Sequence, residues 1–242
     1  TGRANACANV SCRGVHVEGA MQELFKVRER DVYKVPNTLE DLVLGASVEP
    51  FAIGAQAVWR GNVSTGQTMV IFGAGPIGLT TMFMAMNCGA QCILIDMKED
   101  RLANAIRLGA IGGILATAED LKEQVLALCE EGGPDVTCDA VGNPAIVDMC
   151  VDLVAPTGTV ILLGMDGQPN NVTELSIFRK ELTIVGSRMN SAMFPTVLGL
   201  IEKNALPLDA ILTHRFSVDQ ASEAFTMAIE QPEGFTKAVI TF

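Results

Sequence analysis

The chain has 242 residues, of which 49% are hydrophobic and 19% are charged, a balance typical of a globular protein with one or two cores. Its formal net charge of −11 argues against nucleic acid and anionic membrane surfaces as partners. The longest apolar runs are broken by glycine or polar residues, so we expect no membrane-spanning segment.

The first part of the chain contains weak structural signals. Residues 15–35 alternate loosely between apolar and polar side chains, and we expect antiparallel strands that end near Pro36. A short helical turn is predicted over 39–44, followed by a helix over 51–60.

Strands and helices alternate from residue 68 onward. Strands are predicted over 68–72, 91–95, 113–116, 135–140, 159–163 and 182–187, and helices over 76–87, 99–108, 119–131 and 144–153. This alternation predicts βαβ units with right-handed crossovers in a doubly wound, six-stranded parallel sheet, an α/β fold of the Rossmann type. Two further helices, over 192–203 and 217–230, and a strand over 237–242 complete the chain.

The seven cysteines are spread along the chain and include no Cys-x-x-Cys pair. Most of them lie in apolar segments, where they behave as small buried hydrophobes in a reducing compartment. The composition therefore predicts a cytoplasmic location and no self-contained zinc cluster.

A G-x-G-x-x-G motif (Gly73, Gly75 and Gly78) joins the first of these strands to its helix. In a dinucleotide site the first glycine allows a tight turn, the second admits the pyrophosphate, and the third lets the helix pack closely. Pro76 and Ile77 open the helix, whose N-terminus favours phosphate. A glycine-rich turn in another kind of α/β protein is the alternative.

Asp96 ends the second strand, 18 residues beyond Gly78, where a carboxylate can accept hydrogen bonds from the ribose hydroxyls. A carboxylate repels a 2′-phosphate, so we expect NAD, although Lys98 offers a positive charge that would suit NADP. Alternatively, Asp96 caps the following helix.

The turns after the fourth and fifth strands contain small residues that leave room for the nicotinamide ribose and ring. These residues are Val141, Gly142, Leu163 and Gly164. The alternative is ordinary glycine use in βα turns.

Several segments together resemble the zinc-dependent medium-chain dehydrogenases, in the sorbitol, threonine and sugar-acid branch. They include 14–20, 48–53, 70–79, 139–144 and 186–190, and the resemblance runs over the whole chain. The ending looks especially similar to bacterial enzymes that oxidise hexonic acids such as L-galactonate. This resemblance implies a truncated GroES-like catalytic domain over 1–50, an NAD-binding domain over 51–187, and a return to the catalytic domain over 188–242.

The resemblance also implies roles for single residues. Arg101 matches a residue along the adenine edge, Glu49 a glutamate at or near the catalytic zinc, and Arg188 an arginine that reaches the substrate. Cys7 matches the last of four structural zinc ligands, and the other ligands of both metals belong to a block that precedes this chain in the family. Each residue also has a simpler interpretation. Arg101 could be an exposed helix residue, and Glu49 an acid at the start of a helix. Arg188 could form a surface ion pair, and Cys7 could be a free thiol.

In the full-length enzyme, the resemblance implies oxidation of a secondary alcohol of a polyol or sugar acid with NAD⁺ and zinc. The alternatives are an NAD-binding fragment without catalysis and a zinc-free reductase of the same superfamily. The expected partners are a small-molecule substrate and further copies of the chain, in a homodimer or homotetramer that pairs through the apolar edge strand over 182–187.

Overall fold

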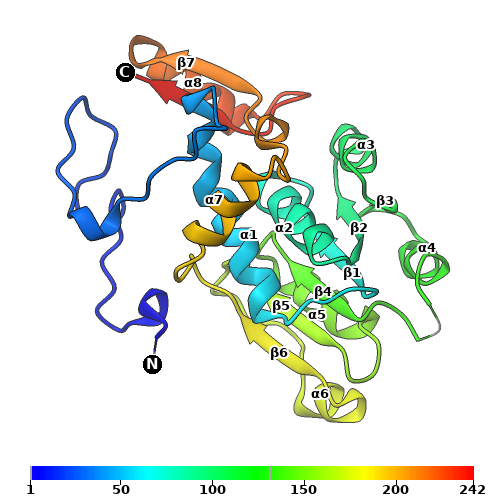
Figure 1. Cartoon of the computed structure of the whole chain (residues 1–242). Helices are drawn as coiled ribbons and strands as arrows, with labels where there is room; N and C mark the ends of the chain where they lie inside the picture. The colour runs from blue at the N-terminus through cyan, green and yellow to red at the C-terminus, as the bar shows by residue number, and fades with distance from the viewer. Residues whose placement is uncertain (1, 131) are drawn as a thin grey trace. The chain divides into compact units, whose positions relative to one another are not determined.

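A computed structural model describes residues 2–130 and 132–242. The chain forms two compact units (Figure 1). The second unit, Ile53–Arg188, contains the large sheet, and the first unit combines the residues up to Ala52 with Met189–Phe242.

The sheet of the second unit has six parallel strands in the order β3-β2-β1-β4-β5-β6. Their bounds are β1 (Thr68–Phe72), β2 (Gln91–Asp96), β3 (Gly112–Leu115), β4 (Val136–Asp139), β5 (Thr159–Leu162) and β6 (Thr183–Gly186). The order reverses between β1 and β4, which creates the crevice where doubly wound sheets bind ligands. The predicted fold class is confirmed.

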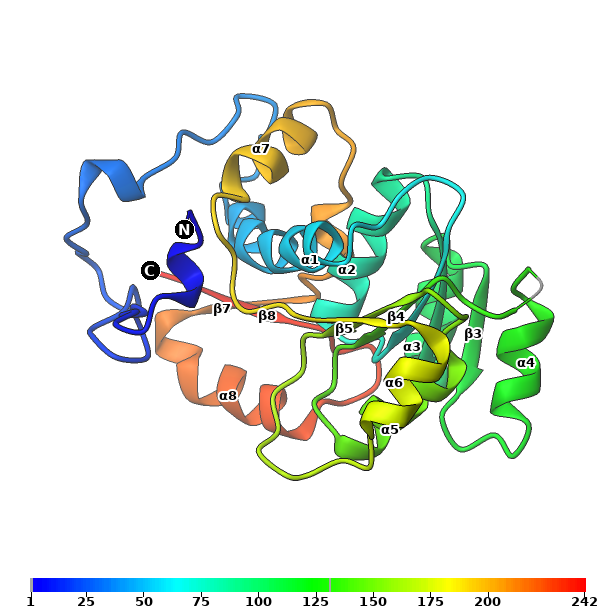
Figure 2. The ribbon, with the colours of Figure 1, turned by 90° about the horizontal axis from the view of Figure 1, so that it is seen from below.

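Helices cover both faces of this sheet, with α2 on one side and α5 and α6 on the other (Figure 2). Their bounds are α2 (Pro76–Asn87), α3 (Glu99–Arg107), α4 (Leu121–Ala127), α5 (Pro144–Leu153) and α6 (Glu174–Lys180). All five residues of β1 are buried, because alternate side chains pack against the helices of opposite faces. Val70 and Phe72 belong to the cluster that includes Val125 of α4 and Cys150 of α5.

The helix α6 is a finding that the sequence pattern did not indicate. Thr173 and Ser176 form a capping box at its start. Near its end, the Lys180 ammonium donates to the carbonyl oxygens of Val151, Asp152 and Val154 at 3.0, 2.6 and 2.9 Å. Lys180 therefore caps the C-terminus of α5, and partial burial lowers its pKa.

The first unit has little regular structure among its described residues. It contains the start of α1 (Val48–Arg60), which continues into the second unit, together with α7 (Phe194–Glu202) and α8 (Ala221–Glu230). The strands β7 (His214–Ser217) and β8 (Ala238–Thr241) pair in a parallel two-stranded sheet. Short 3₁₀ turns complete the unit: Ala4–Ala6, Glu29–Asp31, Leu42–Ser47, Leu208–Ala210 and Val218–Gln220.

The prediction of antiparallel strands over 15–35 is wrong. This segment contains a 3₁₀ turn and takes part in one isolated bridge, between Arg13 and Val17. Val15 and Leu24 remain 75% and 87% exposed, so the alternation of apolar residues buries no face. The helical turn expected over 39–44 lies instead at Leu42–Ser47, where the Asp41 carboxylate accepts the Val43 amide at 3.1 Å.

Leu42–Arg60 forms one continuous helical stretch of 19 residues that is long and apolar enough to cross a membrane. Half of its most apolar window is buried inside the protein, as in the core helix of a globular domain. This stretch is therefore only weak evidence for a membrane span.

Candidate functional site

The glycine loop connects β1 to α2, and two of its glycines are required by the fold itself. Gly73 has φ +99°, a conformation that L side chains rarely adopt. A β-carbon at Gly78 would overlap the carbonyl oxygen of Gly73. The first turn of α2 can therefore lie directly against the loop, as predicted for the first and third glycines.

Gly75 is different, because nothing in the fold demands a glycine there. Its backbone is extended, and the nearest atom to an added β-carbon would be the Arg101 Nη1, at 3.9 Å. The adjoining N-terminus of α2 has Pro76 in its first turn and no side-chain cap, so main-chain N–H groups there are available. The absence of a β-carbon at Gly75 lets a ligand approach the main chain beside the N-terminus of α2. A phosphate group of a dinucleotide fits this position.

Ile77 lies in the first turn of α2 and helps to fix this helix start. Its carbonyl oxygen accepts the hydroxyl groups of Thr80 and Thr81 at 3.0 and 2.8 Å. These threonines are buried, so their hydroxyl groups are satisfied within the helix.

Asp96 joins the end of β2 to the glycine loop. One carboxylate oxygen accepts the Ala74 amide at 2.7 Å, and the other accepts the Lys98 amide at 3.0 Å. Arg101 lies 3.8 Å from the first oxygen, and the Asp96 side chain is only 9% exposed. The residue at the N-cap of α3 is Lys98, so Asp96 forms a turn before the helix and is not its cap.

The turns after β4 and β5 are assembled around Asp139, a residue that the sequence reasoning missed. One oxygen of this buried carboxylate accepts the amides of Val141 and Gly142, both at 2.9 Å. The Asp139 carbonyl oxygen accepts the amides of Leu163 and Gly164 at 3.0 and 2.7 Å. An acid at the end of a buried strand, two residues before a glycine-containing turn, was the available signal.

These turns also meet the glycine loop. A β-carbon at Gly164 would overlap the backbone of Gly142, whose φ is +86°. A β-carbon at Gly73 would lie 3.0 Å from the Val141 side chain. The structure thus brings together the ends of β1, β4 and β5, at the reversal of strand order.

The metal-linked candidates are not brought together. Glu49 lies in the first turn of α1, where burial raises the pKa of its carboxyl and Lys237 partly opposes that shift. Cys7 is exposed. In residues 2–130 and 132–242, no three His, Cys, Asp or Glu side chains gather as a metal site would require, so these residues do not by themselves fit zinc.

Arg188 follows β6 by two residues and is the last residue of the second unit, whereas Glu49 belongs to the first.

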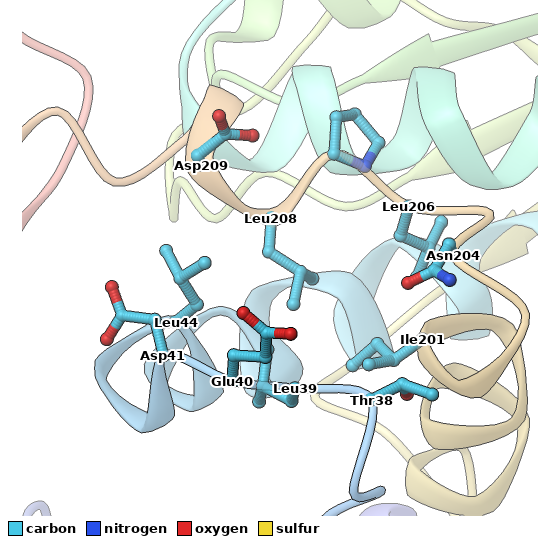
Figure 3. Close-up of a pocket in the computed structure, with 11 residues that line it drawn as sticks. Thr38, Leu39, Glu40, Asp41, Leu44, Ile201, Asn204, Leu206, Leu208 and Asp209 are labelled. Carbon is cyan, nitrogen blue, oxygen red and sulfur yellow. The ribbon is translucent and has the colours of Figure 1, made fainter.

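A separate cavity of about 570 Å³ lies within the first unit (Figure 3). Glu40 and Asp41 lie on one side of it and Asp209 on the other, with leucines between them. Asp41 forms an ion pair with Arg215, which holds the pKa of that carboxyl below its usual range. None of the residues predicted from the sequence as site residues lines this cavity.

Comparison with known proteins agrees with this geometry. A family model described as zinc-binding dehydrogenase matches residues 76–203. The L-galactonate-5-dehydrogenase of Escherichia coli K12 is 30% identical over 243 residues, a match that covers 100% of this chain and 71% of the relative.

Two solved structures match the whole of this chain, and the match covers 71% of each of their chains. The first, RspB of Escherichia coli CFT073, described as a short chain alcohol dehydrogenase, has bound NADH, a TM-score of 0.94 and 28% identity. The second, assigned to the zinc-binding dehydrogenases of Sinorhizobium meliloti 1021, has bound NADP, a TM-score of 0.90 and 29% identity.

Proposed function

We propose that this chain, which belongs to the zinc-binding medium-chain dehydrogenases, binds NAD⁺ in the oxidation of a secondary alcohol of a polyol or sugar acid. The family membership confirms the resemblance predicted from the sequence. The observation that carries the proposal is at Gly75, where the fold does not require a glycine and a β-carbon would meet only the Arg101 Nη1, beside the uncapped N-terminus of α2; a pyrophosphate would need this close approach to the backbone.

Different residues of the chain would bind different parts of the coenzyme. Main-chain N–H groups of Gly75 and of the first turn of α2 would hold the pyrophosphate, and Asp96 would accept the ribose hydroxyls. Val141 and Gly142, with Leu163 and Gly164, would seat the nicotinamide end. When bound, the nicotinamide supplies the acceptor for a hydride from the alcohol carbon.

We propose NAD in preference to NADP because of Asp96. Its carboxylate is fixed at the end of β2 and would repel a 2′-phosphate. Arg101 is already paired with that carboxylate, at 3.8 Å, which reduces the positive charge it offers to a second anion. One related structure holds NADH and another NADP, so the family admits both coenzymes.

The substrate class rests on the hexonate named for one relative. Arg188 is a suitable group to hold a substrate carboxylate or hydroxyl, because its planar guanidinium can donate two parallel hydrogen bonds. We propose that Glu49, in the first turn of α1, lies near a metal in the active enzyme.

The test combines a binding assay with a turnover assay. NADH binding is measured by fluorescence titration, and NAD⁺ reduction is measured with L-galactonate and sorbitol in the presence of zinc. Binding with oxidation supports the proposal. Binding without oxidation supports a second candidate, a coenzyme-binding chain without catalysis, which the isolation of Glu49 from other metal ligands among the described residues favours. Failure to bind NADH contradicts both.

We also propose that two chains associate through β6, in a homodimer or a homotetramer. This strand is an edge of the sheet and has a partly buried apolar centre, Ile184 and Val185. A free edge can pair with a second copy across a two-fold axis. Light scattering that gives the monomer mass of 25.7 kDa at micromolar concentration would contradict this association.

A further inference from the structure

The end of β2 holds two consecutive peptide groups of the glycine loop. The Gly73 amide donates to the carbonyl oxygen of Ile95 at 2.7 Å. The Ala74 amide donates to the Asp96 carboxylate, also at 2.7 Å. The first hydrogen bond is made by main-chain atoms and survives any side chain at 95, whereas the second depends on the identity of residue 96.

The second hydrogen bond is in a dry environment. Ala74 is 2% exposed, and the Asp96 side chain is 9% exposed. Without its acceptor, the Ala74 N–H would be a buried donor with no partner, which costs more than the net gain of a typical hydrogen bond. Ala74 lies between Gly73 and Gly75, and glycine has access to more backbone conformations than other residues, so this hydrogen bond restrains the loop.

The carboxylate itself is held from three directions. One oxygen accepts the Lys98 amide, and the other lies near Arg101 as well as Ala74. The same Arg101 guanidinium would lie 3.9 Å from a β-carbon at Gly75. An ionised carboxylate has about four acceptor positions, so it can keep these contacts and still accept ribose hydroxyls.

We propose that Asp96 is a positioning residue for the glycine loop, in addition to its role toward the ribose. The loop keeps the shape that receives pyrophosphate because this carboxylate holds the Ala74 peptide group and anchors Arg101 beside Gly75. This inference rests on the proposed coenzyme function. It also implies that coenzyme preference and pyrophosphate affinity cannot be changed independently at residue 96.

Two nucleotides separate the two roles of Asp96. ADP carries the ribose hydroxyls, and 2′,3′-dideoxy-ADP carries the same diphosphate without them. Their dissociation constants are measured by calorimetry for the wild type, Asp96→Ala and Asp96→Asn, with Glu119→Gln as an exposed control that removes one negative charge elsewhere. Thermal unfolding shows that each variant is folded.

We expect Asp96→Ala to weaken binding of the dideoxy nucleotide by at least about fivefold, as loss of a hydrogen bond to a charged acceptor implies. Removal of a negative charge would by itself favour an anionic ligand, so a loss of affinity points to the loop. Asp96→Asn retains one acceptor oxygen and should fall between the wild type and Asp96→Ala. Unchanged or stronger binding of the dideoxy nucleotide by Asp96→Ala would overturn the proposal.

A second measurement needs no ligand. The Ala74 amide proton, followed by NMR hydrogen exchange, should exchange at least about tenfold faster in Asp96→Ala than in the wild type or Glu119→Gln. Equal rates in all three proteins would overturn the positioning role. If the wild type binds neither ADP nor NADH while this exchange still accelerates, the proposed coenzyme function fails and the positioning role of Asp96 stands.

Discussion

Gly78 lies so close to the carbonyl oxygen of Gly73 that a β-carbon at Gly78 would overlap it. Gly75, between them, has no such contact, since a β-carbon there would meet only the Arg101 Nη1, at 3.9 Å. The three glycines of the motif therefore have different roles. Gly73 and Gly78 are required by the fold, whereas Gly75 allows a ligand to approach the backbone.

Gly78→Ala should destabilise the protein by at least about 2 kcal/mol, because the backbone oxygen it meets cannot move aside as a side chain would. Urea unfolding of the wild type and the variant measures this change. Gly167→Ala is the matched control, since a β-carbon there meets nothing within 4 Å, and its stability should change by less than about 0.5 kcal/mol. Equal midpoints for Gly78→Ala and the wild type would show that the helix can shift to accept a methyl group.

Gly75→Ala should have the opposite profile. Its backbone is extended and its β-carbon meets no atom closer than 3.9 Å, so we expect the free energy of unfolding to stay within about 0.5 kcal/mol of wild type. The methyl group would occupy the position proposed for the pyrophosphate, so NADH affinity should fall by about tenfold or more. Fluorescence titration with NADH checks this, and an unchanged dissociation constant would mean that the pyrophosphate does not approach Gly75.

Glu49 should make a small pH-dependent contribution to stability. Burial raises the pKa of its carboxyl above the ordinary value of 4.5, so the folded state holds this proton at pH values where the unfolded state has lost it. Stability from this group is therefore greatest below pH 4.5 and is lost as pH rises through the raised folded pKa.

Glu49→Gln should consequently unfold at higher urea than the wild type at pH 7, and the two should converge at pH 4. The side chain retains solvent contact, so the expected gain is below about 1 kcal/mol. Glu202→Gln, an exposed glutamate at the end of α7, is the control and should show no such convergence. A Glu49→Gln variant that is less stable at pH 7 would show that the charged form makes a favourable contact.

Buried and exposed cysteines should differ in how fast they react with iodoacetamide. Burial raises the pKa of Cys92 to about 12 and raises those of Cys138 and Cys150 strongly, so these thiols form almost no thiolate at neutral pH. Exposed Cys7 and Cys88 should be alkylated in the folded protein, Cys88 slowly because partial burial raises its pKa. Peptide mass spectrometry before and after urea unfolding checks this, and rapid native labelling of Cys138 would contradict the buried position.

The central sheet could be predicted because its strands are short apolar runs buried on both faces. The run over 68–72 matches β1 in both bounds, and the glycine motif fixed where α2 begins. Helix α6 gave no comparable signal, because it has seven residues and follows a segment rich in glycine, asparagine and proline. Its position depends on tertiary contacts such as the Lys180 ammonium at the end of α5.

The expected strands over 15–35 show the limit of periodicity. Alternation favours a strand only if a neighbour satisfies its main-chain groups and a core receives its apolar face. Val15 and Leu24 lie in no strand and are 75% and 87% exposed, so neither reaches a core. Similarly, the pattern placed Asp96 correctly at the end of a strand but could not show that its carboxylate holds Ala74, since that contact joins residues 22 positions apart.

The turns after β4 and β5 meet backbone to backbone at Gly142 and Gly164, with no side chain between them. Contacts of this kind cannot be retuned by exchanging one amino acid for another, because any larger residue would push the strand ends apart. Val141 and Met165, which flank this contact, are both exposed, so their side chains can be exchanged without entering it. Substitution of either side chain would therefore change the surface at the ends of β4 and β5 and leave the backbone contact beneath it unchanged.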